Sequence, residues 1–192
     1  QRYLESLKQK IQTRSDREIV LFALLRLLRN DTDQAYKHWL KIKNQLTASD
    51  RSYFLARLGH RAAMRHDPRA LDWFREAQNT PNPYPASDTV LAWQVRAALR
   101  GANWNEVLKT IDRMSPAEQH TDTWRYWKAR ALKAKGKPLD ANQIFIPLSD
   151  EHSFYGQLAR EELGAMLSIA EKTYRVSNSE VSVMERKPGI QR

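Results

Sequence analysis

The sequence of 192 residues contains no cysteine, and glycine and proline are scarce, with six and eight copies. The absence of cysteine excludes a disulfide framework and a thiolate metal site. The glycines are dispersed, so there is no glycine-rich phosphate loop and we expect no nucleotide cofactor. The histidines show no metal-ligand spacing, so we expect no bound metal. They are His38, His60, His66, His120 and His152.

A long apolar run is also missing. The longest one, IVLFALL at residues 19–25, ends at Arg26, whereas a helix needs roughly 20 apolar residues to span a bilayer. No small-residue cleavage site follows it, so it differs from the core of a signal peptide. We interpret this run as part of a buried helix and expect that the chain is not an integral membrane protein.

A small or branched residue is followed four positions later by a bulky apolar residue at four places in the chain. The pairs are Ala35 with Trp39, Ala70 with Phe74, Val107 with Ile111, and Ala141 with Phe145. Their first members are 35, 37 and 34 residues apart, near the period of about 34 residues of tetratricopeptide hairpins. The expected fold is therefore all-α, with tandem tetratricopeptide-like helical hairpins stacked into a right-handed superhelix.

Polar breaks and capping residues define the expected helices. The pattern predicts a short helix near 3–12 and longer ones at 17–29, 32–46, 50–66, 68–79, 87–100, 103–114, 122–135 and 138–149. Ser15 or Asp16 and Ser49 or Asp50 are the candidate N-caps of two of them. The three prolines in residues 79–87 predict an extended crossover loop, because each restricts the residue before it.

Two tryptophans and a tyrosine open the expected helix 122–135. Trp124 and Trp127 are three residues apart and share a helix face with Ala131, so we interpret them as packing residues between helices. Tyr126 lies off this face. We expect its side chain to reach solvent or to hydrogen-bond to a neighbouring helix.

Residues 124–164, WRYWKARALKAKGKPLDANQIFIPLSDEHSFYGQLAREELG, resemble the last helical hairpin of the superhelical U-type domain in soluble lytic murein transglycosylases of the bacterial periplasm. The resemblance is sharp over about residues 120–165 and generic over residues 1–119. Its elements, after the opening W-R-Y-W, are Ala129, Gly136, Ala141 with Phe145, Phe154-Tyr155 and Leu163-Gly164.

The resemblance implies a ring or horseshoe of stacked helices, followed by a lysozyme-like domain. In the family that domain cleaves peptidoglycan between N-acetylmuramic acid and N-acetylglucosamine, and one glutamate acts as acid and then base to give a 1,6-anhydro product. This sequence lacks the family's Gly-Leu-Met-Gln and Ala-Tyr-Asn-Ala-Gly segments. Its one Glu-Ser pair, Glu5-Ser6, falls on an expected amphipathic helix.

We therefore expect a non-catalytic scaffold fragment of a periplasmic enzyme, with no catalytic residue of its own. Residues 1–164 would form the superhelical domain, and residues 165–192 a linker towards a catalytic domain that the fragment lacks. We expect that no signal peptide is part of this fragment. A free-standing tetratricopeptide-like module that binds a protein is the alternative, and an RNA-binding helical repeat is a third interpretation.

Positive charge is concentrated in the first third of the chain. Residues 1–66 hold 14 Lys and Arg against 6 Asp and Glu, out of a net charge of +10 for the whole sequence. Arg57, Arg61 and Arg65 recur every four residues and form one stripe on a helix. This stripe is a candidate binding site for an anionic polymer. The resemblance favours peptidoglycan glycan strands over nucleic acid as the partner, with other cell-wall enzymes as further partners.

Overall fold

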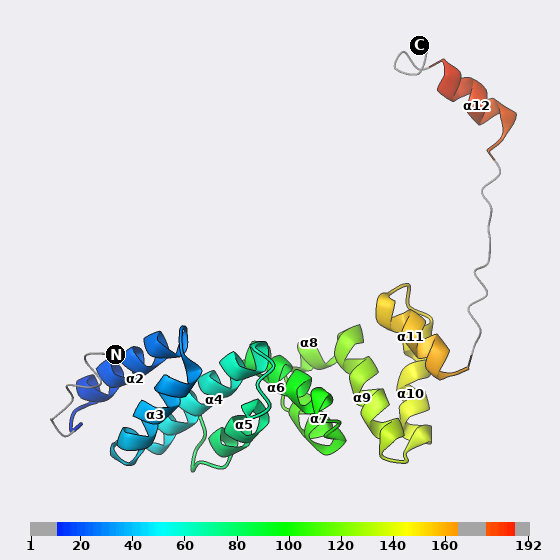
Figure 1. The fold of residues 1–192 in the computed structure, drawn as a ribbon. Helices are drawn as coiled ribbons and strands as arrows, with labels where there is room; N and C mark the ends of the chain where they lie inside the picture. Colours follow the sequence, from blue (N-terminus) through cyan, green and yellow to red (C-terminus); the bar gives the residue numbers. More distant parts are fainter. Residues whose placement is uncertain (1–10, 165–175, 187–192) are drawn as a thin grey trace.

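The computed structural model describes residues 11–164 and 176–186, and every regular element in these ranges is a helix (Figure 1). The all-α prediction is confirmed. The predicted helix 3–12 lies almost wholly outside the described residues. The helices are α2 (Arg14–Leu28), α3 (Thr32–Ile42), the 3₁₀ turn η1 (Lys43–Gln45), α4 (Ala48–Met64), α5 (Ala70–Gln78), α6 (Asp88–Arg100), α7 (Trp104–Ile111), α8 (Pro116–Gln119), α9 (Asp122–Ala134), α10 (Pro138–Ser149), α11 (Phe154–Glu162) and α12 (Asn178–Glu185).

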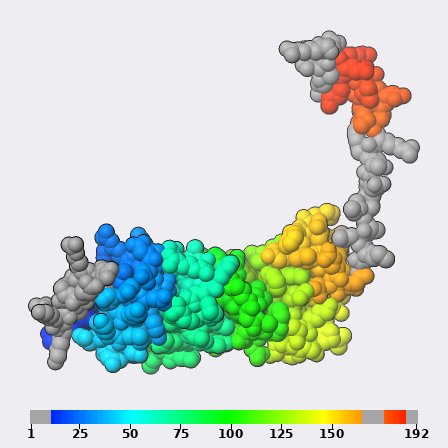
Figure 2. Space-filling view, viewed as in Figure 1, coloured from blue at the N-terminus to red at the C-terminus, as the bar shows by residue number. Residues whose placement is uncertain are grey.

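Consecutive helices pack as hairpins, which follow one another along an elongated body (Figures 1 and 2). The hairpins are α2 with α3, α4 with α5, α6 with α7, and α9 with α10. The first helices of neighbouring hairpins also pack on each other, α2 on α4 and α4 on α6, and α7 then packs on α9. The predicted tandem hairpins are confirmed.

All four predicted small–large pairs are buried, each on the second helix of its hairpin. The small residues Ala35, Ala70, Val107 and Ala141 and the bulky residues Trp39, Phe74, Ile111 and Phe145 are all at most 1% exposed. Helices come especially close at Gly59 of α4. A Cβ there would lie 3.0 Å from the Phe74 ring and 3.1 Å from the Ala70 carbonyl oxygen, so this glycine lets α4 approach α5.

The apolar core runs along the whole stack in three clusters. The first joins α2, α3, α4 and α5 and reaches α6 at Val90, the second joins α6, α7 and α9, and the third joins α9, α10 and α11. Trp127 packs against both the second and the third cluster, so the last two hairpins share one continuous apolar interior.

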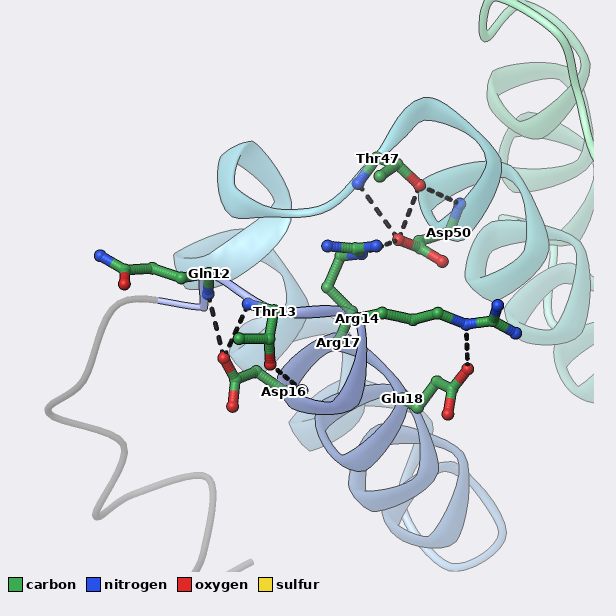
Figure 3. Close-up of polar contacts among 8 residues, drawn as sticks. All are labelled: Gln12, Thr13, Arg14, Asp16, Arg17, Glu18, Thr47 and Asp50. Carbon is green, nitrogen blue, oxygen red and sulfur yellow. Dashed lines mark hydrogen bonds and ion pairs between the residues drawn. The ribbon is translucent and has the colours of Figure 1, made fainter.

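The N-caps of α2 and α4 are threonines, so the predicted caps are wrong by two or three residues. Thr13 and Thr47 accept a hydrogen bond from the backbone amide of the aspartate three positions later (Figure 3). Asp16 and Asp50 in turn accept from the backbone amides of these threonines, at 2.8 and 3.2 Å. Each aspartate is therefore the second half of a capping box and not the cap itself.

Tyr126 is buried, so the expectation that it reaches solvent is wrong. It is 5% exposed, and its ring centroid lies 5.3 Å from those of Trp127 and Tyr155 and 5.9 Å from that of Phe145. The reason is a third layer, because α11 packs against the side of α9 that a two-helix hairpin would leave open. Burial also raises the pKa of the Tyr126 phenol. Trp124 is buried and Trp127 half-buried, which confirms their role in packing.

The remaining differences concern short elements and boundaries. Residues 79–87 contain no helix, as predicted, and the Tyr84 amide donates to the Ser52 hydroxyl at 2.9 Å. Helix α5 begins at Ala70 and not at Pro68, and α8 was not predicted. Helix α12 lies within the segment expected to be a linker, and the eight residues it contains are exposed. The division between residues 1–164 and 165–192 stays a prediction, because residues 165–175 lie outside the described ranges.

Candidate polymer-binding site

Helices α2 and α4 are joined at both ends by arginine side chains. Near their N-terminal ends, the Arg17 guanidinium lies 3.2 Å from the Asp50 carboxylate (Figure 3). At the C-terminal end of α2, Arg61 and Arg65 donate to the Arg29 carbonyl oxygen at 2.7 and 3.2 Å. The last carbonyls of a helix lack intrahelical partners and carry partial negative charge, so cations stabilise them.

The same contact recurs one hairpin later. Arg100, the last residue of α6, donates to the Ala63 carbonyl oxygen near the end of α4 at 2.6 Å. We call this pair of contacts, Arg61 to Arg29 and Arg100 to Ala63, the arginine rungs. Two of the three predicted stripe residues, Arg61 and Arg65, therefore also hold neighbouring hairpins together.

An open hollow of about 590 Å³ lies between the end of α2 and the middle of α4. Tyr53, Arg57 and Arg61 line it from one face of α4, since they are four residues apart along the helix. Arg65 is not among the residues that line it. Among the residues that the structure describes, those that line the hollow are Leu25, Leu28, Arg29, Asn30, Tyr53, Arg57 and Arg61.

Sequence reasoning found Arg57 and Arg61 but missed the half of the hollow that α2 contributes. Arg29 is the C-cap of α2 and Arg65 that of α4, so these two residues occupy equivalent positions in successive hairpins. Arg61 lies one helical turn before Arg65. A stripe on a single helix cannot reveal such a partner, because the hollow exists only where two repeats meet.

The positive charge around the hollow acts on the neighbouring His60. Burial lowers the pKa of this imidazole below its ordinary value of 6.5, and the guanidinium groups of Arg57 and Arg61 lower it further. The ring of His60 also lies edge-on to Trp93 of α6, with 6.2 Å between the centroids. The pKa of His60 is therefore sensitive to the positive charges of Arg57 and Arg61.

Replacing Arg57 with glutamine should raise the pKa of His60 towards its ordinary value, because one of the two nearby positive charges is removed. A histidine whose folded pKa is depressed makes the fold less stable as pH falls below its unfolded pKa. The variant should therefore lose less stability than the parent as the pH is lowered through about 6. The pKa is measured by NMR titration of the imidazole.

Arg65→Gln serves as the control for this titration, because Arg65 is on the same stripe, whereas the pKa of His60 is lowered by burial, Arg57 and Arg61. An equal rise in both variants would mean that overall charge, and not the position of Arg57, governs His60.

Two charged groups elsewhere in the described ranges are engaged within the fold. Glu106 is 8% exposed and accepts from the Gln94 amide at 2.8 Å, so it is a satisfied core carboxylate and not an exposed acid. The Arg96 guanidinium lies 5.1 and 5.3 Å from the ring centroids of Trp93 and Trp124. No three His, Asp or Glu side chains of residues 11–164 and 176–186 are grouped as metal ligands.

Within the same ranges, no helix is long and apolar enough to cross a membrane. The described helices thus form an elongated stack of hairpins, with a hollow lined by arginines between two of them. Guanidinium groups are the side chains that recognise carboxylates and phosphates through paired hydrogen bonds.

Comparison with known proteins shows to which proteins of this kind the chain is similar. No protein-family model matches the chain. The chain is 27% identical over 78 residues to the soluble lytic murein transglycosylase of Escherichia coli K12 and 28% identical to that of Salmonella typhimurium LT2. Each alignment covers 41% of this chain and 12% of the relative.

The X-ray structure of an inactive mutant of the lytic transglycosylase Slt from Pseudomonas aeruginosa is similar to the whole chain. The TM-score is 0.70 at 22% identity, over 100% of this chain and 31% of the other. The resemblance to the helical part of lytic transglycosylases is therefore confirmed in sequence and in fold. The chain spans less than a third of the length of this neighbour.

Proposed function

We propose that this chain is a non-catalytic helical scaffold of a periplasmic lytic transglycosylase. The whole enzyme would cleave peptidoglycan between N-acetylmuramic acid and N-acetylglucosamine to give 1,6-anhydro products. The scaffold would position the glycan strand, or other cell-wall enzymes, relative to the catalytic domain. The observation that carries the proposal is the similarity of fold over the full chain to the Pseudomonas Slt structure.

Three further features support the proposal. The curated relatives that share sequence with the chain are named soluble lytic murein transglycosylases. The sequence lacks the Gly-Leu-Met-Gln and Ala-Tyr-Asn-Ala-Gly segments of the family's catalytic domain. Helix α11 ends at Glu162, which agrees with a superhelical unit at residues 1–164 and a connecting segment at residues 165–192.

Within this function, Arg57, Arg61 and Arg65 are the proposed polymer-binding residues. Peptidoglycan carries carboxylates on its peptides, and guanidinium groups bind carboxylates through paired hydrogen bonds. Arg57 is exposed and has no hydrogen bond or ion pair to another described residue. Its guanidinium is thus available to a ligand.

The purified chain should co-sediment with purified peptidoglycan, and the bound fraction should fall as salt is added, because exposed charges are screened over roughly 10 Å at 0.1 M. Replacing Arg57, Arg61 and Arg65 together with glutamate should lower the bound fraction severalfold. Circular dichroism of the same variant establishes whether the helices persist.

The matched control replaces Lys41, Lys109 and Lys137 with glutamate. These three side chains are exposed and lie on or next to the second helices of other hairpins, so the net charge changes equally. Equal loss in both variants would show that binding follows overall charge. Absence of binding at low salt, together with binding to a protein partner, would favour the tetratricopeptide-like module instead.

A further inference from the structure

The hollow between α2 and α4 has two chemically different sides. Arg57 and Arg61 contribute guanidinium groups from α4, whereas Leu25 and Leu28 contribute aliphatic carbon from α2. Tyr53 and Asn30 add a hydroxyl and an amide that can both donate and accept hydrogen bonds. A volume of about 590 Å³ is in the range of sites that hold small molecules.

The cations of the hollow lack a negative partner within the described residues. None of the residues that line it there is acidic. Arg57 has no described hydrogen-bond or ion-pair partner. Only one terminal nitrogen of Arg61 is engaged, by the Arg29 carbonyl oxygen. An added oxyanion would therefore supply acceptors that the fold itself leaves out.

Three cations on neighbouring parts of the fold are already engaged. Arg65 and Arg100 donate to backbone carbonyl oxygens, and the Arg96 guanidinium lies 5.1 and 5.3 Å from the ring centroids of Trp93 and Trp124. A nucleic-acid strand needs a continuous track of free cations along its phosphates. The arrangement instead favours one local anion, placed where Arg57 and Arg61 face the same space.

The apolar side of the hollow distinguishes between small anions. Leu25 and Leu28 both line the hollow, and the partly buried Leu25 leaves more of its hydrocarbon accessible to a ligand than the buried Leu28. A phosphate ion has no carbon to place there. A carboxylate at the end of a peptide has a side chain on the adjacent carbon, and an aliphatic one would gain by removal from water.

We propose that this hollow binds the terminal carboxylate of a short peptide, with Arg57 and Arg61 on the carboxylate and the last, aliphatic side chain against Leu25 and Leu28. Tyr53 and Asn30 then flank the peptide backbone. The choice of a peptide rests on the proposed function, since the peptides of peptidoglycan carry such carboxylates. The site itself rests on the geometry of the hollow.

The test is an NMR titration of the full chain with N-acetyl-alanyl-alanine. Saturable shifts are expected at the amides of Asn30, Tyr53 and Arg57. The C-terminal amide of the same dipeptide should bind about tenfold more weakly or not at all, because it lacks the charge that strengthens the hydrogen bonds. Arg57→Gln should weaken dipeptide binding to a similar extent.

Arg51→Gln is the matched control, since Arg51 is on α4 but does not line the hollow, and it should bind the dipeptide like the parent. Equal binding of the carboxylate and amide dipeptides, or unchanged binding by Arg57→Gln, would overturn the proposal. So would inorganic phosphate or a single-stranded oligonucleotide that binds more tightly than the dipeptide at the same salt concentration.

The two proposals fail separately. Saturable dipeptide binding without co-sedimentation on peptidoglycan would retain the carboxylate site and contradict the proposed function. Co-sedimentation that the dipeptide does not reduce, with no shifts in the hollow, would retain the proposed function and contradict the carboxylate site.

Discussion

Replacing Gly156 with alanine should destabilise the chain by about 3 kcal/mol or more, because the added methyl group has no space. A Cβ at this position would overlap the Glu151 carbonyl oxygen and lie 2.9 Å from the Leu148 carbonyl oxygen. Both obstacles are backbone atoms, so no side-chain rotation can relieve the contact. Helix α11 would have to move away from α10, and urea unfolding followed by circular dichroism measures the loss.

Gly101→Ala is the control for this substitution. Gly101 ends α6 with φ of −92°, which any residue adopts, and the nearest atom to an added Cβ there is 3.8 Å away. Its free energy of unfolding should stay within about 0.5 kcal/mol of that of the parent. If both variants were equally stable, the close approach of α11 to the end of α10 would be wrong.

Phe145→Ala should lower the free energy of unfolding by about 3 to 5 kcal/mol, the range for removing a fully buried aromatic ring. Phe145 is 0% exposed and belongs to the third core cluster, next to Tyr126. The cavity would open where α9, α10 and α11 meet. Thermal unfolding by calorimetry or circular dichroism reports the loss.

The chain supplies its own comparison in Phe154, which is 68% exposed. Phe154→Ala removes the same atoms but should change stability by only about 0.5 kcal/mol, because most of the ring is already in water. A larger loss for Phe154 than for Phe145 would mean that the predicted register of the last hairpin is shifted.

The repeat could be predicted from the sequence because its signal is local. A small residue followed four positions later by a bulky one lies on one helix face, and each of the four predicted pairs is buried. The extended loop at residues 79–87 was also predictable, since its three prolines fall within five residues and each biases the residue before it away from the helical conformation. Both features depend on residues that are close together in the chain.

The features that sequence reasoning missed depend on a neighbour that is distant in sequence. Tyr126 is buried because α11 covers it. The sequence of residues 122–135 contains no signal that a further helix packs against this side of α9. The hollow needs Arg29 and Asn30 from α2 beside Arg57 from α4. The caps at Thr13 and Thr47 were missed for a different reason, because a capping box contains two polar residues and either can pass for the cap.

In each arginine rung, the amino-acid type of the donor residue is constrained, whereas that of the acceptor residue is not. The donor must be a long cationic side chain, because each contact is a bond from a side-chain nitrogen to a carbonyl oxygen on the neighbouring hairpin. The acceptor at residue 29 or 63 is a main-chain carbonyl, which every amino acid supplies. Substitution of the acceptor side chain therefore leaves the contact intact. A comparison of amino-acid types between repeats can therefore detect the donor residue of a rung but not its acceptor. Part of the contact between successive hairpins cannot be recognised from the sequence.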